Sequence, residues 1–163
     1  MKLKILIAAI LMPVILLTGC TSDTDTDKNT PAANAAPTEI VNAVLAEIPI
    51  TSGLEKGKED IPDFYSDIDL SQIESASFAI CASGAYPDEI AVMKCTDTSA
   101  ASTVKSAFEK RLESQTELYS TYTPDEVYKL ETAKVYTTGN YAIFLAVSDN
   151  DKAKEIVDEK LTG

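Results

Sequence analysis

The stretch GNYAIFLAV (residues 139–147) carries the strongest structural signal in this chain of 163 residues. From Tyr141 to Val147 every side chain is apolar, so both faces of an extended strand would be hydrophobic. Such a strand is typical of the interior of a sheet that is covered on both sides. Gly139 and Asn140 precede the strand and favour a tight turn. We therefore expect a sheet in which Tyr141–Val147 is a central strand with packed elements on each face.

Two hairpins account for the expected strands. Lys134–Thr137 pairs with Tyr141–Val147, and Ser75–Ser83 pairs with Asp88–Cys95 around the sequence GAYP. In both cases glycine and polar or proline neighbours separate two strand-like runs, which is the usual signal of a hairpin. The pattern predicts about four antiparallel strands.

Each hairpin is followed by a predicted helix. The first begins at Thr98 or Ser99 and has the apolar stripe expected of a helix that lies on a sheet. The second is capped by Ser148 or Asp149. The stripe of the first helix consists of Ala101, Val104, Phe108, Leu112, Gln115 and Tyr119. The buried positions of the second are Ala153, Ile156, Val157 and Leu161.

A further helix precedes the hairpins. Thr38 is its predicted cap, Ile48 is its last apolar position, and Pro49 ends it. The segment from residue 49 to 74 has mixed signals and is expected to form loops with at most one short helix. Its expected anchors are Ile61, Phe64, Tyr65, Ile68 and Leu70.

The sequence TPDE after Tyr122 predicts one more short helix. Thr123 can cap it, Pro124 suits the first helical position, and Glu126 stands where a capping box places an acidic residue. This helix should end near Ala133.

These elements predict an α+β fold. It has a small antiparallel sheet of about four strands in ββα-ββα order, with helices packed on the sheet and an N-terminal helix before it. The two helices that follow the hairpins can cover one face of the sheet. The other face needs the N-terminal helix, residues 61–70 or a partner. Residues 38–163 are expected to form a single globular domain.

The N-terminal stretch has the layout of a bacterial secretion signal. Two lysines precede an apolar run, Ile5–Leu17, which is too short to cross about 30 Å of hydrocarbon comfortably. Leu17-Thr18-Gly19-Cys20 resembles the lipobox of bacterial lipoproteins. The resemblance implies removal of residues 1–19 by cleavage after Gly19 and lipidation of the Cys20 thiol, which would hold the protein on the outer face of the cell membrane. The alternatives are an ordinary signal peptide with an incidental cysteine and an uncleaved membrane helix.

Residues 20–37 are predicted to be the lipidated cysteine and a disordered acidic tether. The segment is rich in Thr, Asp, Ala and Pro and too poor in apolar residues to fold. Asp23, Asp25 and Asp27 imitate the first ligands of a calcium loop. However, Lys28 and Asn34 stand where that loop requires glycine and glutamate, so the motif fails.

Composition limits the possible functions. The chain has 14 basic and 26 acidic residues and a net charge of −12, and loss of the two signal lysines would lower it to −14. Such a charge is unsuited to nucleic acid or to anionic lipid. The chain has no histidine, which removes the usual serine and cysteine triads and most catalytic zinc sites. No catalytic residue, cofactor or metal site is predicted.

Three segments carry a resemblance to a known family. They are DEIAVMK (88–94), FEKRLESQTELYSTYTPDEVYKLETAKV (108–135) and GNYAIFLAV (139–147). Together they resemble the bacterial lipoproteins that carry the domain of unknown function 4358, over most of residues 38–161. The resemblance implies a small extracytoplasmic α+β domain. It implies no catalytic or binding residues, because the family has no established activity.

Two cysteines remain besides Cys20, and an exported protein can form disulfides. With the hairpin turn near Tyr86, Cys81 should lie opposite Ile90 or Ala91, and Cys95 opposite Ala76 or Ser77. An offset of about four residues is roughly 13 Å, which exceeds the reach of a disulfide. Two buried free thiols are expected, with a disulfide as the alternative.

Several other patterns imitate functional sites. Ser102 and Lys105 fit the S-x-x-K motif of penicillin-recognising enzymes, and residues 148–150 read SDN. Those enzymes have a much larger fold, and residues 148–150 are needed as a helix cap, so we reject this interpretation.

The acidic and tyrosine clusters can likewise be interpreted either as functional sites or as ordinary structural features. Asp67, Asp69 and Glu74, or Glu55, Glu59 and Asp60, could pair as acid and base or hold calcium, but a solvated surface is the simpler interpretation in so acidic a chain. Tyr119, Tyr122 and Tyr128 could line a groove, but packing at helix ends with wet hydroxyl groups is preferred.

The main functional hypothesis is a membrane-anchored, non-catalytic binding or accessory module of the cell envelope, with a protein or small-ligand partner. The alternatives are a small envelope hydrolase with paired carboxylates and a structural spacer. A hydrolase should have a deep pocket with converging ionisable groups. A binding module should have an exposed apolar patch instead.

Overall fold

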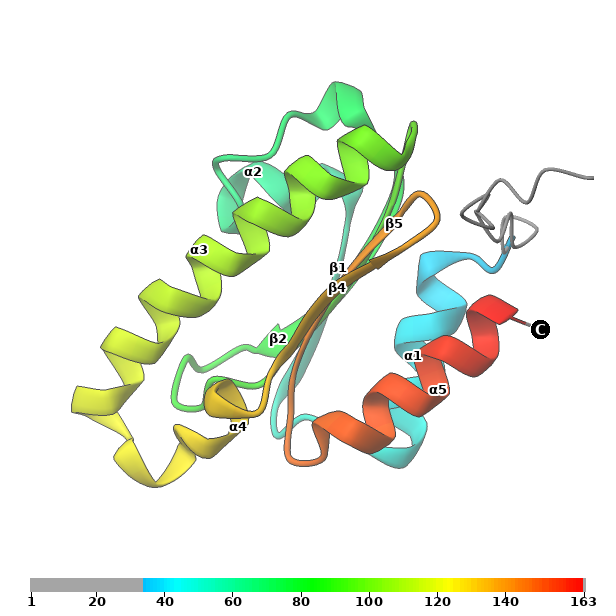
Figure 1. The fold of residues 1–163 in the computed structure, drawn as a ribbon. Helices are drawn as coiled ribbons and strands as arrows, with labels where there is room; N and C mark the ends of the chain where they lie inside the picture. The colour runs from blue at the N-terminus through cyan, green and yellow to red at the C-terminus, as the bar shows by residue number, and fades with distance from the viewer. Residues whose placement is uncertain (1–33, 163) are drawn as a thin grey trace, which may run out of the picture.

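A five-stranded antiparallel sheet lies between two helical layers (Figure 1). The computed structural model describes residues 34–162. The strand order is β1-β2-β3-β5-β4. The strands are β1 (Gly53–Gly57), β2 (Ile73–Cys81), β3 (Glu89–Cys95), β4 (Lys134–Thr138) and β5 (Tyr141–Ala146). The helices are α1 (Pro37–Glu47), α2 (Ile61–Phe64), α3 (Thr98–Tyr122), α4 (Tyr128–Glu131) and α5 (Asn150–Thr162), with 3-10 turns η1 (Lys58–Asp60), η2 (Leu70–Gln72) and η3 (Pro124–Glu126). The predicted α+β class is confirmed.

Strand β5 has the interior position that its composition predicts. It pairs with β3 on one side and with β4 on the other, and all its residues are buried. The predicted turn joins β4 to β5: Thr138 pairs with Tyr141, and Gly139 between them has a φ of +56°, a left-handed conformation that glycine adopts without strain.

Side chains on the two sides of the sheet form two separate cores. We call the side covered by α1 and α5 the aliphatic face, and the side covered by α3 and residues 61–70 the aromatic face (Figure 1). The main residues of the aliphatic face are Ile40, Val41, Val44, Ile90, Val92, Ile143, Leu145, Ile156, Val157 and Leu161. Those of the aromatic face are Ile61, Tyr65, Phe78, Met93, Val104, Phe108, Tyr119 and Phe144, with alanines at 91, 100, 101, 142 and 146.

The two helices that follow the hairpins therefore lie on opposite faces, not on one as the ββα-ββα order suggested. Helix α3 has 25 residues. At 1.5 Å per residue it is about 37 Å long, which exceeds the length of every strand. With residues 61–70 beside it, α3 fills the aromatic face, and α5 packs with α1 on the other.

The sheet has five strands, where about four were expected. The additional strand is β1, which pairs with β2 from Gly53 opposite Cys81 to Gly57 opposite Ser77. Its sequence, GLEKG, has two glycines and two charged residues and is mostly exposed. Strand propensity is too weak here to identify a strand, and pairing with the preformed edge of β2 decides it.

The predicted cap at Thr38 is wrong, because helix α1 begins at Pro37 and Thr38 lies inside it. Thr123 does precede η3, with Pro124 at the first position as predicted, but its side chain accepts no capping hydrogen bond. The backbone N–H of Thr123 closes α3 by donating to the Tyr119 carbonyl at 2.9 Å. The chain after Thr123 forms η3 and then α4 instead of one helix. The prediction for the last helix is confirmed: the Asp149 carboxylate accepts from the N–H of Lys152 at 2.9 Å.

The first described residues, 34 and 35, contact the sheet at the end where the β4–β5 turn lies. Tyr141 Oη donates to the Ala35 carbonyl at 2.8 Å, and Lys94 Nζ lies 3.4 Å from Asn34 Oδ1. The predicted signal peptide, cleavage site Gly19, lipidation site Cys20 and the aspartates at 23, 25 and 27 lie outside the described residues. Within residues 34–162, no helix combines the length and hydrophobicity needed to cross a membrane.

Candidate functional site

Four large apolar side chains are exposed together at one end of the molecule. Exposed fractions are 38% for Tyr86, 50% for Leu118, 74% for Tyr122 and 45% for Tyr128. We call these four residues the tyrosine patch. In the described part of the chain, the other large apolar side chain with comparable exposure is Leu54 on β1. Grouped exposure of this kind marks an interaction surface more often than scattered exposure does.

The patch residues are joined by shared surroundings. Leu118 and Tyr122 line a shallow hollow of about 310 Å³ whose other walls include Gly84 and Ala85 of the β2–β3 loop. The Lys129 ammonium lies 5.5 Å from the ring centroid of Tyr86 and 6.0 Å from that of Tyr128. The patch therefore extends from α3 over the loop to α4.

Helix α3 holds one half of the patch away from the sheet. Figure 1 shows that α3 diverges from the sheet toward its C-terminal end, where η3 and α4 lead back to β4. Tyr119 faces inward, and its hydroxyl lies 3.1 and 3.0 Å from the carbonyl oxygens of Gly84 and Tyr86. Leu118 and Tyr122, four residues apart on the neighbouring helix face, remain exposed.

A buried carboxylate fills the space between α3 and the sheet. Glu89 is 1% exposed. It accepts two hydrogen bonds from Arg111 Nε, at 2.8 and 2.9 Å, and one from Gln115 Nε2 at 2.8 Å. The Tyr65 hydroxyl donates to the same carboxylate. Arg111 Nη1 donates to the Phe64 carbonyl at 3.1 Å, so the group ties α2, β3 and α3 together.

The electrostatics of this group favour a fixed ion pair. Burial raises the pKa of Tyr65 well above its ordinary value, and the Glu89 charge adds to the effect. Burial alone would lower the pKa of Arg111, but the Glu89 carboxylate outweighs burial and raises it. Each oxygen of Glu89 already has two donors. The carboxylate is therefore saturated, and the group supports the structure instead of offering a general base.

A second ion-pair group lies directly under the patch. Lys129 Nζ is 2.7 Å from Asp88 and 2.6 Å from Glu126. Burial alone would lower the pKa of Lys129, but hydrogen bonds to these two carboxylates raise it. Asn150 Nδ2 donates to the Lys129 carbonyl at 2.8 Å, which links α4 to the start of α5. Tyr86 and Tyr128 thus stand on a rigid base.

A longer groove runs along α3 beside the patch. It encloses about 480 Å³ between α3 and residues 64–67, and its walls include Arg111, Gln115 and Leu118. Lys110 and Asp67 form an exposed ion pair of 3.4 Å on these walls. In the part of the chain that the structure describes, Asp67 is the acidic residue on these walls and is paired, so the groove has no converging pair of free carboxylates.

The tyrosines were only partly predicted from the sequence. Tyr119 has the buried ring that was expected. The preferred interpretation is wrong for Tyr122 and Tyr128, whose rings are exposed. Leu118 lies one position before Tyr119, at the border of the apolar stripe, whereas Tyr122 continues the stripe three positions after Tyr119. The sequence therefore contained no signal that the Tyr122 ring is exposed. Glu89 and Arg111 were not singled out. The polar Gln115 within the apolar stripe was the hint of a buried polar partner.

The acidic clusters are not assembled into sites. Asp67 pairs with Lys110 and Glu74 with Lys94, whereas Asp69 caps η2 by accepting from the Ser71 N–H at 2.9 Å. That hydrogen bond lowers the pKa of Asp69.

The second cluster, Glu55, Glu59 and Asp60, is not assembled into a site either. The Asp60 carboxylate accepts from the Gly57 N–H, which lowers its pKa, and from Lys56, while Glu55 lies exposed on β1. Among residues 34–162, no group of three acidic, cysteine or histidine side chains is arranged to hold a metal ion.

The S-x-x-K motif is part of the exposed surface of α3. Ser102 Oγ donates to the Thr98 carbonyl at 3.0 Å, and Lys105 pairs with Glu109 one turn further on. Neither side chain approaches the other as nucleophile and activator would.

The two cysteines are free, as expected, but the hairpin register differs from the prediction. Ile80 pairs with Glu89, and Ile73 with Cys95, so the strands are shifted by about two residues. Cys81 belongs to the aliphatic face and Cys95 to the aromatic face. Because successive strand residues point to opposite faces, the two thiols cannot meet.

The comparisons with known proteins give one match. A family model described as "Domain of unknown function (DUF4358)" matches residues 47–148. This range begins at the end of α1 and includes the whole sheet, α3 and all four residues of the tyrosine patch. No curated protein and no solved structure matches the chain.

Proposed function

This chain belongs to the DUF4358 family, and we propose that it is a membrane-anchored extracytoplasmic lipoprotein that acts as a non-catalytic binding module of the cell envelope. The tyrosine patch is its docking surface for another envelope protein. Lipidation of Cys20 supplies the anchor, as the resemblance of residues 17–20 to a lipobox implies.

The tyrosine patch is the observation that carries the binding role. A binding module needs a contiguous exposed apolar surface on a rigid support, and aromatic residues are the commonest anchors of such surfaces. The buried ionisable groups nearby are paired with one another, Glu89 with Arg111 and Asp88 with Lys129. They hold the patch in place, whereas a hydrolase would leave carboxylates free and facing a pocket.

The position of the patch suits a protein held by its N-terminus. The chain reaches the domain beside Tyr141, and the β2–β3 loop leaves the sheet at Glu89, which pairs with Ala146 at the other end of β5. Strand β5 alone separates these ends by about 20 Å. An anchor on residue 20 would therefore attach the domain at the end opposite the patch.

The anchor is tested by metabolic labelling with radioactive palmitate in a bacterium with working lipid-transfer machinery. The full chain should take up label and partition into the detergent phase, and Cys20→Ala should abolish both. An unlabelled wild-type chain in the aqueous phase would contradict the anchor.

The docking role is tested by site-specific photo-crosslinking in the native host. A benzoylphenylalanine replaces Thr121, an exposed residue beside Leu118 and Tyr122. The matched control replaces Glu155, which is exposed on α5. A discrete protein adduct should form at residue 121 and be absent at residue 155. Loss of the adduct in Leu118→Ser/Tyr122→Ser would assign it to the patch, and absence of any adduct at residue 121 would contradict the proposal.

A further inference from the structure

Charge around the tyrosine patch points to the class of partner. The segment 109–131, which contributes Leu118, Tyr122 and Tyr128, has six acidic and three basic residues. All three bases are already paired: Lys110 with Asp67, Arg111 with Glu89, and Lys129 with Asp88 and Glu126. They therefore leave no free positive charge at this end of α3.

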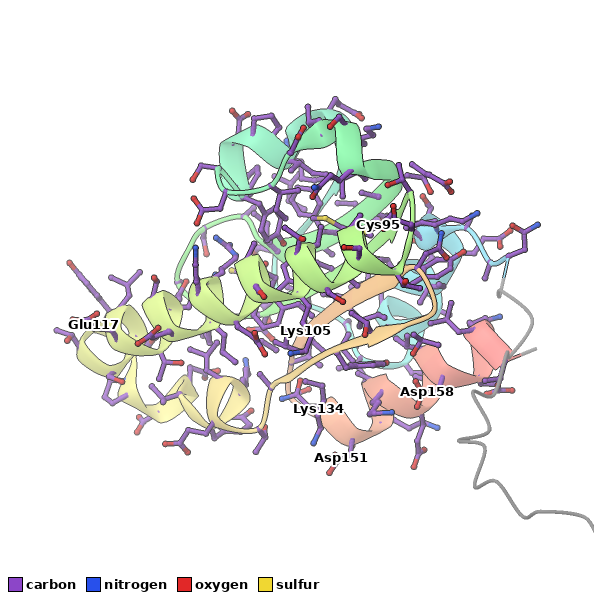
Figure 2. The ribbon with its side chains drawn as sticks, turned by 45° about the horizontal axis from the view of Figure 1, so that its top comes forward. Cys95, Lys105, Glu117, Lys134, Asp151 and Asp158 are labelled. Carbon is purple, nitrogen blue, oxygen red and sulfur yellow. The ribbon has the colours of Figure 1, made fainter. Side chains whose placement is uncertain are left out.

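The acids of this segment are in the opposite situation. In the described part of the chain, four of them have no basic side chain within 4.0 Å, so their charge faces solvent. These four are Glu113, Glu117, Asp125 and Glu131. Figure 2 shows Glu117 at the far end of α3, well away from Asp151 and Asp158 on α5. Glu117 also lines a hollow of about 380 Å³ together with Leu118 and Tyr122.

The arrangement combines an apolar centre with a negative rim. Interfaces with this anatomy obtain most of their affinity from the buried aromatic centre and their steering and selectivity from the rim. The exposed rings of Tyr86, Tyr122 and Tyr128 additionally attract cations over their faces. A second copy of the chain would bring acid against acid, as would nucleic acid or an anionic membrane.

We infer that the tyrosine patch binds a basic, apolar segment of another protein, in which Lys or Arg side chains flank aliphatic or aromatic ones. This inference rests on the proposed docking function and adds the chemistry of the partner. The apolar side chains occupy the hollows beside Leu118 and Tyr122. The cations face Glu117 and Asp125 and the tyrosine rings.

The test identifies the partner peptide to which the patch is cross-linked. The full-length chain with benzoylphenylalanine at residue 121 is irradiated in cells, and the adduct is digested and sequenced by mass spectrometry. We expect the attachment site in a segment of net positive charge that contains long apolar residues.

Rim variants provide the matched comparison. Glu117→Lys/Asp125→Lys should lower the adduct yield about tenfold, because it replaces attraction by repulsion. Glu155→Lys/Glu159→Lys on α5 makes the same change in net charge and should leave the yield unchanged. Circular dichroism of each variant checks that the fold is retained.

The outcomes separate the two proposals. An adduct in a neutral or acidic segment, or equal yields from the two charge-reversal variants, overturns the basic partner and leaves docking intact. Absence of any adduct overturns both. A basic, apolar attachment site with a selective loss in the rim variant supports both.

Discussion

The two faces of the sheet are built differently although they share the same strands. The aliphatic face is packed mainly with Ile, Val and Leu from α1, α5 and the sheet, and Tyr141 is the aromatic ring in its described core cluster. The aromatic face combines small alanines with packed rings. Tyr65 is in edge contact with Phe78 and Phe108, at centroid distances of 5.2 and 5.5 Å, and the Phe108 ring is tilted against that of Phe144 at 5.8 Å. Its outer end continues into the buried ion pairs and the tyrosine patch.

The two faces therefore differ in role: the aliphatic face stabilises the sheet, and the aromatic face also supports the tyrosine patch. Aliphatic packing depends on shape and volume and stabilises the sheet without specifying a surface. On the aromatic face, α3 extends past the strands, and Glu89, Arg111 and Gln115 fill the widening gap with directed hydrogen bonds. The buried charges thus fix α3 against the sheet next to the tyrosine patch.

The largest expected effect on stability comes from truncating a core side chain of strand β5 on either face. Phe144→Ala should lower the free energy of unfolding by about 4 kcal/mol and Leu145→Ala by about 3 kcal/mol, because each leaves a cavity on its own face. Urea denaturation of the purified full chain measures both. A loss below about 1 kcal/mol in either variant would show that its face is not a core.

The next effect tests the buried ion pair. Arg111→Met leaves the Glu89 carboxylate buried without its cation and should cost about 3 kcal/mol of unfolding free energy. Glu89→Leu/Arg111→Met should recover most of this loss, since it removes both charges. Lys105→Met, which breaks the exposed pair with Glu109 on the same helix, is the matched control and should change stability by no more than about 0.5 kcal/mol. Equal losses in Arg111→Met and Lys105→Met would contradict the contrast between buried and exposed pairs.

A smaller effect of opposite sign is expected where α3 ends. The Thr123 hydroxyl is buried and has no hydrogen-bond partner among residues 34–162, so Thr123→Val should raise the free energy of unfolding by about 1 kcal/mol. Thr132 is the control. Its hydroxyl donates to the Tyr128 carbonyl and accepts from Asn150, so Thr132→Val should lower stability by about 1 kcal/mol. The signs are read from paired denaturation curves, and a loss in both variants would refute the assignment for Thr123.

The reactivities of Cys81 and Cys95 compare the two faces without a change in the sequence. Burial alone would raise the pKa of Cys81, but hydrogen bonds from the Ser83 side chain and from the N–H groups of the β2–β3 loop lower it. Burial, with Asp97 and Glu74 nearby, raises the pKa of Cys95 to about 11. Since the thiolate is the reactive form, Cys81 should react with iodoacetamide at least about tenfold faster at pH 8.

The pH profile of alkylation sharpens this prediction. The rate at Cys81 should level off below the pKa of an ordinary cysteine, whereas the rate at Cys95 should still rise toward pH 11. Mass spectrometry of time points reads both sites in one sample. Equal rates, or a faster Cys95, would show that the two thiols do not differ as their surroundings require.

Much of the fold followed from local patterns. The hairpin at 134–147 was predictable because strand β5 is apolar at every position and Gly139-Asn140 suits its turn. Helix α3 was predictable from its stripe. Whether the Thr123 side chain caps the next turn was not, since the same four residues can close one helix or begin another. Of the candidate site, Tyr119, Tyr122 and Tyr128 were noticed, but whether each ring is buried depends on which side of α3 meets the sheet.

By itself the sequence determined the α+β class, the two main hairpins and the interior place of Tyr141–Val147, because hydrophobic periodicity is encoded within a few neighbouring residues. Only the tertiary structure decided that α3 and α5 cover opposite faces, that Gly53–Gly57 joins the sheet, and that Glu89 meets its partners. Tyr65 and Arg111 lie 24 and 22 positions from Glu89 along the chain. Contacts of that range arise from the packing of whole elements, which no local pattern records.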